Sequence, residues 1–122
     1  MRAAKKILVV DDEPTIRDVV VALLEDEGYA VVAAHTGLRA LELLPLERPD
    51  LVIMDVMMPG LDGREVFRRM RESRNGHAPP VVMMSAAVDR DLIDPSVAAF
   101  LPKPFDLTDL LDTIERVLAR QG

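Results

Sequence analysis

The chain has 122 residues, the size of one domain, and its 49% hydrophobic and 30% charged residues are typical of a globular protein. Its formal charge of −6 argues against a nucleic-acid-binding surface, and the absence of cysteine excludes disulfides and thiol chemistry. No apolar run is long enough for a secretory signal or a membrane span. We therefore predict one cytoplasmic domain, residues 1–122, that contacts no membrane.

The first elements alternate a strand with a helix. The apolar run at residues 6–10 predicts a strand that is buried on both faces. In the helix that follows, Pro14 suits the first position and Gly28 suits the C-terminal stop. The apolar residues between them have the spacing of one helix face. Residues 30–34 predict the second strand.

The middle of the chain repeats this alternation. Thr36 can cap a short helix, and Pro45 is expected to end it. Residues 50–54 predict the third strand. A loop rich in proline and glycine then leads to a helix that Asp62 is expected to cap. The arginines of this helix are expected on its solvated face.

The last third of the chain supplies two more strands, at residues 80–84 and 98–101, and a final helix that Asp106 is expected to cap. Between these strands, residues 86–97 have poor helical periodicity, and Pro95 breaks any helix that reaches it. We expect at most about two helical turns there. The whole pattern predicts an α/β fold, a doubly wound parallel sheet of five strands with a shortened or irregular fourth helix.

Three acidic residues and one lysine lie at the ends of predicted strands. Asp11 and Asp12 follow the first strand, Asp55 follows the third, and Lys103 follows the fifth. Because the carboxyl ends of parallel strands share one edge of a sheet, these side chains are expected to meet. Clustered carboxylates repel one another, and Mg²⁺ is a cation that suits such oxygen ligands. With a lysine to bind a phosphoryl oxygen, the sequence predicts phosphoryl transfer to an aspartate.

Four motifs lie in order at the predicted strand ends. They are Val10-Asp11-Asp12-Glu13, Met54-Asp55-Val56-Met57-Met58-Pro59-Gly60-Leu61-Asp62-Gly63, Met84-Ser85-Ala86 and Phe100-Leu101-Pro102-Lys103-Pro104-Phe105. Together they resemble the receiver domain of bacterial response regulators, the CheY-like family. The resemblance runs from about Lys5 to Ala119, so that we interpret residues 1–122 as a single receiver domain.

The resemblance implies a role for each acidic residue. Asp55 would be the phosphoacceptor, and it would receive its phosphoryl group from a histidine kinase or a histidine phosphotransfer protein. Asp12 and Asp55 would bind Mg²⁺ directly, Asp11 would act through water, and the backbone carbonyl of Met57 would complete the protein ligands. The implied function is a signalling switch of a two-component system.

The resemblance also assigns the remaining site residues. Lys103 and Ser85 would each contact a phosphoryl oxygen, and the small Ala86 would leave the site open. Phe100 would change its rotamer when Ser85 moves. The Lys103–Pro104 peptide is expected to be cis. The plainer interpretations are an ordinary loop serine for Ser85 and core packing for Phe100.

Two departures from the family pattern have consequences. The separation of Ser85 and Lys103 is about one helical turn shorter than usual, which puts the usual signalling and dimer face in doubt. We therefore expect a monomer or a weak dimer. Met57 and Ala87 are apolar where a side chain would otherwise orient a hydrolytic water. We therefore expect a long-lived phosphoryl group.

Four alternatives remain beside the stand-alone switch. The chain is also consistent with a phosphoryl relay intermediate, or with a receiver that belongs to a longer regulator or a hybrid kinase. An aspartate-nucleophile phosphatase would need a second acid two residues past Asp55, where Met57 stands. We therefore expect a domain that catalyses its own phosphoryl transfer and dephosphorylation without turnover of an external substrate. A receiver-like module that is never phosphorylated is disfavoured by the intact set of site residues.

Overall fold

A computed structural model describes residues 4–73, 78–86 and 90–121. Five parallel strands form one sheet in the order β2-β1-β3-β4-β5. The strands are β1 (Lys6–Val10), β2 (Ala30–Ala34), β3 (Leu51–Asp55), β4 (Val81–Ser85) and β5 (Ala99–Pro102), and the helices are α1 (Pro14–Asp26), α2 (Gly37–Glu47), α3 (Gly63–Glu72) and α4 (Leu107–Arg120). The predicted fold is confirmed. The last three strands begin and end one residue later than predicted, so Asp55 and Ser85 belong to strands.

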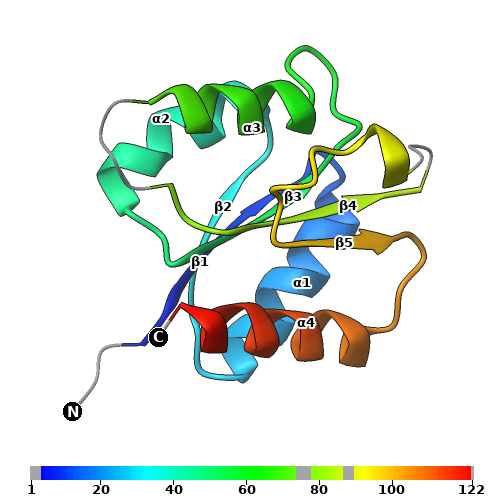
Figure 1. Ribbon diagram of the computed structural model, residues 1–122. Coiled ribbons are helices and arrows are strands. Elements are labelled where there is room, and N and C mark those ends of the chain that lie inside the picture. The colour runs from blue at the N-terminus through cyan, green and yellow to red at the C-terminus, as the bar shows by residue number, and fades with distance from the viewer. Residues whose placement is uncertain (1–3, 74–77, 87–89, 122) are drawn as a thin grey trace.

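Helices cover both faces of the sheet. Figure 1 shows α2 and α3 on one face and α1 and α4 on the other. Each face has its own apolar core, one built with Phe67 and Met70 of α3 and the other with Leu110 and Ile114 of α4. Because successive strand residues point to opposite faces, a strand between two cores must be apolar throughout. This explains the continuous apolar runs in the sequence.

Helix α2 begins as predicted and ends later than predicted. The Thr36 hydroxyl accepts a hydrogen bond from the Arg39 N–H at 3.0 Å, so the predicted cap is confirmed. The prediction that Pro45 ends this helix is wrong, because α2 continues to Glu47. Pro45 lies in the last turn, where its ring removes one backbone donor without preventing the turn from closing.

The predicted caps of the two later helices differ in outcome. The Asp62 carboxylate accepts the N–H groups of Arg64 and Glu65 at 2.8 and 3.2 Å, so it caps α3 as predicted. Asp106 precedes α4, but its side chain makes no capping hydrogen bond, and that part of the prediction is wrong. The arginines of α3 form ion pairs on its exposed side, as predicted.

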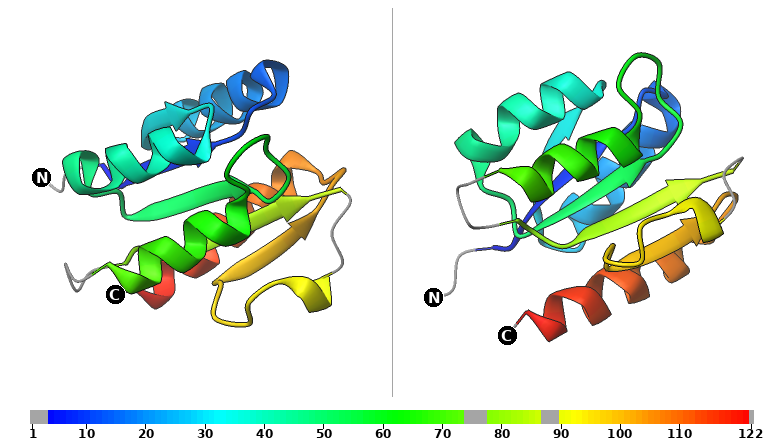
Figure 2. Two further views of the ribbon diagram at one scale, coloured as in Figure 1. Left: turned by 90° about the horizontal axis from the view of Figure 1, so that it is seen from above. Right: turned by 45° about the horizontal axis from the view of Figure 1, so that its top comes forward.

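The connection from β4 to β5 contains one short helical turn, the 3₁₀ helix η1 (Arg90–Leu92). Figure 2 shows it at the β5 edge of the sheet. Ile93 is buried against the α3 face, and the Arg71 Nη1 donates to Asp94 Oδ2 and Ser96 Oγ at 3.0 and 2.8 Å. The predicted shortened fourth helix is confirmed for residues 90–97, while residues 87–89 lie outside the described part of the chain.

Candidate functional site

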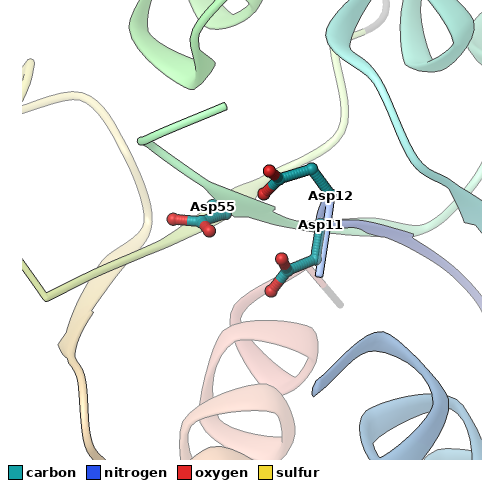
Figure 3. A group of neighbouring side chains, drawn as sticks. All are labelled: Asp11, Asp12 and Asp55. Atoms are coloured by element: carbon teal, nitrogen blue, oxygen red, sulfur yellow. The ribbon is translucent and has the colours of Figure 1, made fainter. Parts of the chain in front are cut away.

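The three aspartates meet at the carboxyl end of the sheet (Figure 3). β1 and β3 are neighbours, and Val10 pairs with Met54, so the residues that follow them lie side by side. One carboxylate oxygen from each of Asp11, Asp12 and Asp55 lies within 4.8 Å of the others. The structure therefore brings together the three acids that the sequence placed at two separate strand ends.

Lys103, the residue that follows β5, completes the cluster. Its Nζ lies 3.2 Å from Asp11 Oδ2 and 3.1 Å from Asp55 Oδ2. The backbone N–H of Lys103 donates to the Ser85 carbonyl at 2.9 Å, which ties the lysine to the end of β4. The Lys103–Pro104 peptide is cis, as predicted. The lysine thus lies between two buried carboxylates.

Burial governs the electrostatics of this cluster. It raises the pKa of Asp55 above its ordinary value, and the Asp11 charge adds to this, while Lys103 and the Met57 N–H offset only part of the rise. For Lys103, burial alone would lower the pKa, but the hydrogen bond to Asp55 and the charges of Asp11 and Asp55 raise it overall. With one lysine for three carboxylates, the site is short of positive charge.

Asp11 makes structural contacts that the sequence did not predict. Its Oδ1 accepts the Glu13 N–H at 2.9 Å, and its carbonyl oxygen accepts from Arg17 Nη1 at 3.0 Å. The side chain is fully buried, so these contacts hold the start of α1 against the site. The acidic pair Asp11-Asp12 signalled the charge, but no sequence pattern indicated the contact with Arg17.

Gly63 is a second residue that the sequence did not single out. A Cβ at this position would lie 2.5 Å from the Asp55 carbonyl oxygen and 3.0 Å from the Val56 Cα. The Gly63 N–H also donates to the Val56 carbonyl at 2.9 Å. The first residue of α3 therefore packs directly on the end of β3. A glycine at the start of a helix is the only sequence signal for this close approach.

The site opens into a cavity of about 630 Å³. Asp12, Asp55 and Lys103 line its polar end, and the remaining lining is mainly apolar, from Ile16, Val19, Val20, Met57, Ala86, Pro104, Phe105 and Leu107. Met57 is 51% exposed, and its N–H donates to Asp55 Oδ1 at 3.2 Å. Met57 is thus an exposed residue that lines the cavity next to Asp55.

Ser85 and Phe100 occupy different positions relative to the acids. Ser85 ends β4, is buried, and lies one residue past Met84, the register partner of Asp55. Phe100 is half-buried, pairs with Met83, and packs on the core of the α3 face. The structure therefore places Ser85 beside the acids and Phe100 on the edge strand β5, against the core of the α3 face. Ala87 lies outside the described residues.

The described residues contain no helix that is long and apolar enough to cross a membrane.

One cluster among the described residues is suited to a divalent cation. Its three carboxylates supply the oxygen ligands that Mg²⁺ prefers. This acidic triad is typical of the Mg²⁺ site of receiver domains.

Comparisons with known proteins agree with this geometry. The family model of the response regulator receiver domain matches residues 7–115. The response regulator MprA of Mycobacterium ulcerans is 40% identical, and the alignment covers 94% of this chain and 50% of the relative. The chain thus spans about half the length of the curated relatives that it matches.

Solved structures show the same architecture. A CheY-like response regulator receiver domain protein from Methanospirillum hungatei superposes with a TM-score of 0.89 at 28% identity, over 98% of this chain and 97% of that one. The chemotaxis protein CheY4 of Vibrio cholerae gives a TM-score of 0.79 at 32% identity, over 94% of this chain and 99% of that one.

Proposed function

The chain belongs to the CheY-like response regulator receiver family of two-component signal transduction, and from this premise we propose that it is a phosphorylation switch with Asp55 as its phosphoacceptor. The family is one of signalling domains and not of classical enzymes, and a receiver domain implies a histidine kinase as partner. The observation that carries the proposal is the contact of the buried Asp55 carboxylate with Lys103 at 3.1 Å beside two further acids.

Asp55 would act as the nucleophile. One of its carboxylate oxygens attacks the phosphorus of a phosphohistidine whose ring is protonated on its other nitrogen. The P–N bond breaks, the bonding electron pair stays on the ring, and the products are an acyl phosphate and a neutral histidine. Lys103 already bridges Asp11 and Asp55, so a small shift of its Nζ would bring it to an oxygen of the transferred group. Because hydrogen bonds hold Lys103 at its backbone N–H and at its Nζ, the side chain is oriented before the donor arrives.

Mg²⁺ fits the acid cluster as the cofactor of this reaction. Asp12 and Asp55 would bind the ion directly, Asp11 would act through water, and the Met57 carbonyl would complete the protein ligands. The bound ion supplies positive charge beside the transferred group, which the single lysine cannot supply alone. The raised pKa of Asp55 supports this role, since a nearby cation favours the ionised carboxylate that attack requires.

Ser85 and Phe100 would carry the signal from the site. The Ser85 hydroxyl would donate to a second phosphoryl oxygen, and its position at the end of β4 supports this role. Phe100 would respond from the adjacent strand. Met57 offers an apolar side chain at the cavity, so we propose that the acyl phosphate is long-lived. The histidine phosphotransfer protein is the alternative donor.

A second form of the same function is a receiver within a longer regulator. It is supported by the span of the chain, which covers about half the length of MprA relatives. We further propose that residues 1–122 act as a single receiver unit, monomeric or weakly dimeric. Measurement of its size in solution, with and without the phosphoryl mimic beryllofluoride, tests this, and a tight dimer on activation would contradict it.

The acceptor is tested with a small phosphodonor. Incubation with Mg²⁺ and acetyl phosphate should add one phosphoryl group that base removes, as expected for an acyl phosphate. Asp55→Asn should abolish the labelling, and Asp112→Asn, which changes an exposed aspartate on α4, is the matched control. A label that persists in Asp55→Asn, or that maps to Ser85, would contradict the proposal.

A further inference from the structure

Met57 is the most exposed methionine in the described part of the chain. Its side chain is 51% exposed, and the chain has no cysteine. The other methionines that the structure describes are buried, each at 7% exposure or less: Met54, Met58, Met70, Met83 and Met84. Oxidation of a thioether depends on its exposure, so Met57 is chemically distinct from its neighbours.

Met57 is exposed and also lies beside the acidic site. The residue lines the same cavity as Asp12, Asp55 and Lys103, and its N–H donates to Asp55 Oδ1. A chemical change at its side chain therefore acts inside the site. Met58, one position later, is buried in the core of the α3 face and does not line the cavity. Met58 is therefore an internal control for the oxidation of Met57.

We propose that Met57 is an oxidative modification site, at which a peroxide forms a sulfoxide that shortens the life of the acyl phosphate on Asp55; the second part rests on the proposed function. The sulfur lone pair attacks one oxygen of hydrogen peroxide, and the O–O bond breaks. The hydroxyl that remains on sulfur passes its proton to the departing hydroxide. Sulfur is oxidised to the sulfoxide and the peroxide is reduced to water.

Oxidation of Met57 adds a strong hydrogen-bond acceptor for water to the cavity. A thioether is a weak hydrogen-bond acceptor, whereas a sulfoxide is polar and accepts strongly. During hydrolysis the water oxygen attacks phosphorus, the bond from Asp55 oxygen to phosphorus breaks, and a water proton passes to the phosphate. A sulfoxide oxygen that accepts a hydrogen bond from this water would hold it beside the phosphoryl group. Methionine sulfoxide reductases reverse the modification, so the change can serve as a switch.

The modification is tested first, without any phosphorylation. The full chain is exposed to hydrogen peroxide for increasing times and digested with trypsin. Met54, Met57 and Met58 fall in one peptide, and fragmentation distinguishes them. Met57 should be oxidised several-fold faster than the other two. Equal rates, or faster oxidation of Met58, would overturn the assignment of the site.

The regulatory effect is tested on the acyl phosphate. Protein phosphorylated with acetyl phosphate and Mg²⁺ is freed of donor, and the loss of the acyl phosphate is followed with and without prior oxidation. Oxidised wild type should lose it several-fold faster, while Met57→Leu should decay at one rate with or without peroxide. Met57→Gln, which keeps a polar acceptor, should decay faster than Met57→Leu without peroxide.

The outcomes separate the two proposals. An unchanged lifetime with Met57 fully oxidised would overturn the regulatory effect. Absence of any acyl phosphate in the unoxidised protein would overturn the proposed function, and the peptide map would still decide whether Met57 is the modified residue. Restoration of the lifetime by a methionine sulfoxide reductase would support the switch.

Discussion

The acidic site and the β4–β5 connection both adjoin the sheet, but different kinds of contact fix them in place. At the site, the buried Asp11 carboxylate contacts both Lys103 and the Glu13 N–H, and Gly63 packs on the Asp55 backbone. In residues 90–97 of the connection, the buried Ile93, the partly buried Val97 and the exposed contacts of Arg71 contribute to the attachment.

This difference determines how each region should tolerate substitution. Buried charges require matched partners, because loss of one partner leaves an uncompensated charge in a low-dielectric environment. An exposed connection has no such requirement, so its helix can be reduced to one turn while the site stays intact. Substitutions at the acidic site should therefore lower the free energy of unfolding more than substitutions in the connection. Only the losses at the site should depend on Mg²⁺.

The largest effect should follow from Lys103→Met. This change removes the cation that lies between Asp11 and Asp55 and leaves their charges facing each other. We expect a loss of about 3 kcal/mol in the free energy of unfolding without metal, in the range for a broken buried ion pair. Urea unfolding at neutral pH measures it. Mg²⁺ should restore part of the loss, because it replaces the missing positive charge.

Lys6→Met is the control for this substitution. Lys6 pairs with Glu47 at 3.1 Å, but both side chains are about one-third exposed. The loss in free energy of unfolding should be small for Lys6→Met, and Mg²⁺ should not change it. Equal losses for the two variants, or no recovery of Lys103→Met with Mg²⁺, would mean that the charge balance of the site does not control its stability.

Ile93→Ala tests the β4–β5 connection. Ile93 is 7% exposed and is the buried anchor of the connection among residues 90–97. Truncation should cost about 2 kcal/mol, at the low end for a buried aliphatic side chain, because the exposed segment can collapse around the cavity. The same loss is expected with and without Mg²⁺. A loss that Mg²⁺ relieves would show that the connection and the site are energetically coupled.

The sequence predicted the clustering of the acids but not the contacts that hold the connection, for a physical reason. Strand order places Asp11, Asp12 and Asp55 at one edge, so strand ends and charges were sufficient to bring them together. The contact of Arg71 with Asp94 and Ser96 joins residues far apart in sequence through a segment without periodicity. No local pattern predicts such a contact.

Smaller errors have equally local causes. Pro45 was expected to end α2, but its place in the last turn makes the missing donor tolerable. Asp106 has the right residue type and position for a cap, yet its carboxylate makes no capping hydrogen bond. Residue type predicts that a cap is possible, and only the side-chain rotamer decides whether it forms.

The two caps provide a test of intermediate size. Asp62 lies beside the site and accepts two N–H groups of α3, so Asp62→Ala should cost about 1 kcal/mol at neutral pH. Asp106→Ala should cost less than about 0.5 kcal/mol, because it loses only the favourable charge at a helix N-terminus. Thermal unfolding of both variants measures the difference, and equal losses would contradict it.

The effect of Asp62 should depend on pH. Burial would raise its pKa, but the hydrogen bonds from Glu65 and Arg64 outweigh this, and its pKa lies below the ordinary value. A lowered pKa in the folded state means that the contribution is fully present above the unfolded pKa of about 3.9. It is lost as the pH falls through the folded pKa. The difference between wild type and Asp62→Ala should therefore shrink only in acid.

The smallest effect on global stability should come from Arg71→Gln. Arg71 holds Asp94 and Ser96 at the surface, and exposed ion pairs contribute little to unfolding free energy. Local opening of the connection does not require unfolding of the sheet, so the change should appear there instead. Amide hydrogen exchange should accelerate in residues 93–98 and stay unchanged in β1 and β3. Arg68→Gln, which removes ion pairs within α3 alone, is the matched control. If Arg71→Gln leaves exchange in residues 93–98 unchanged, the surface contact of Arg71 has no part in holding the connection.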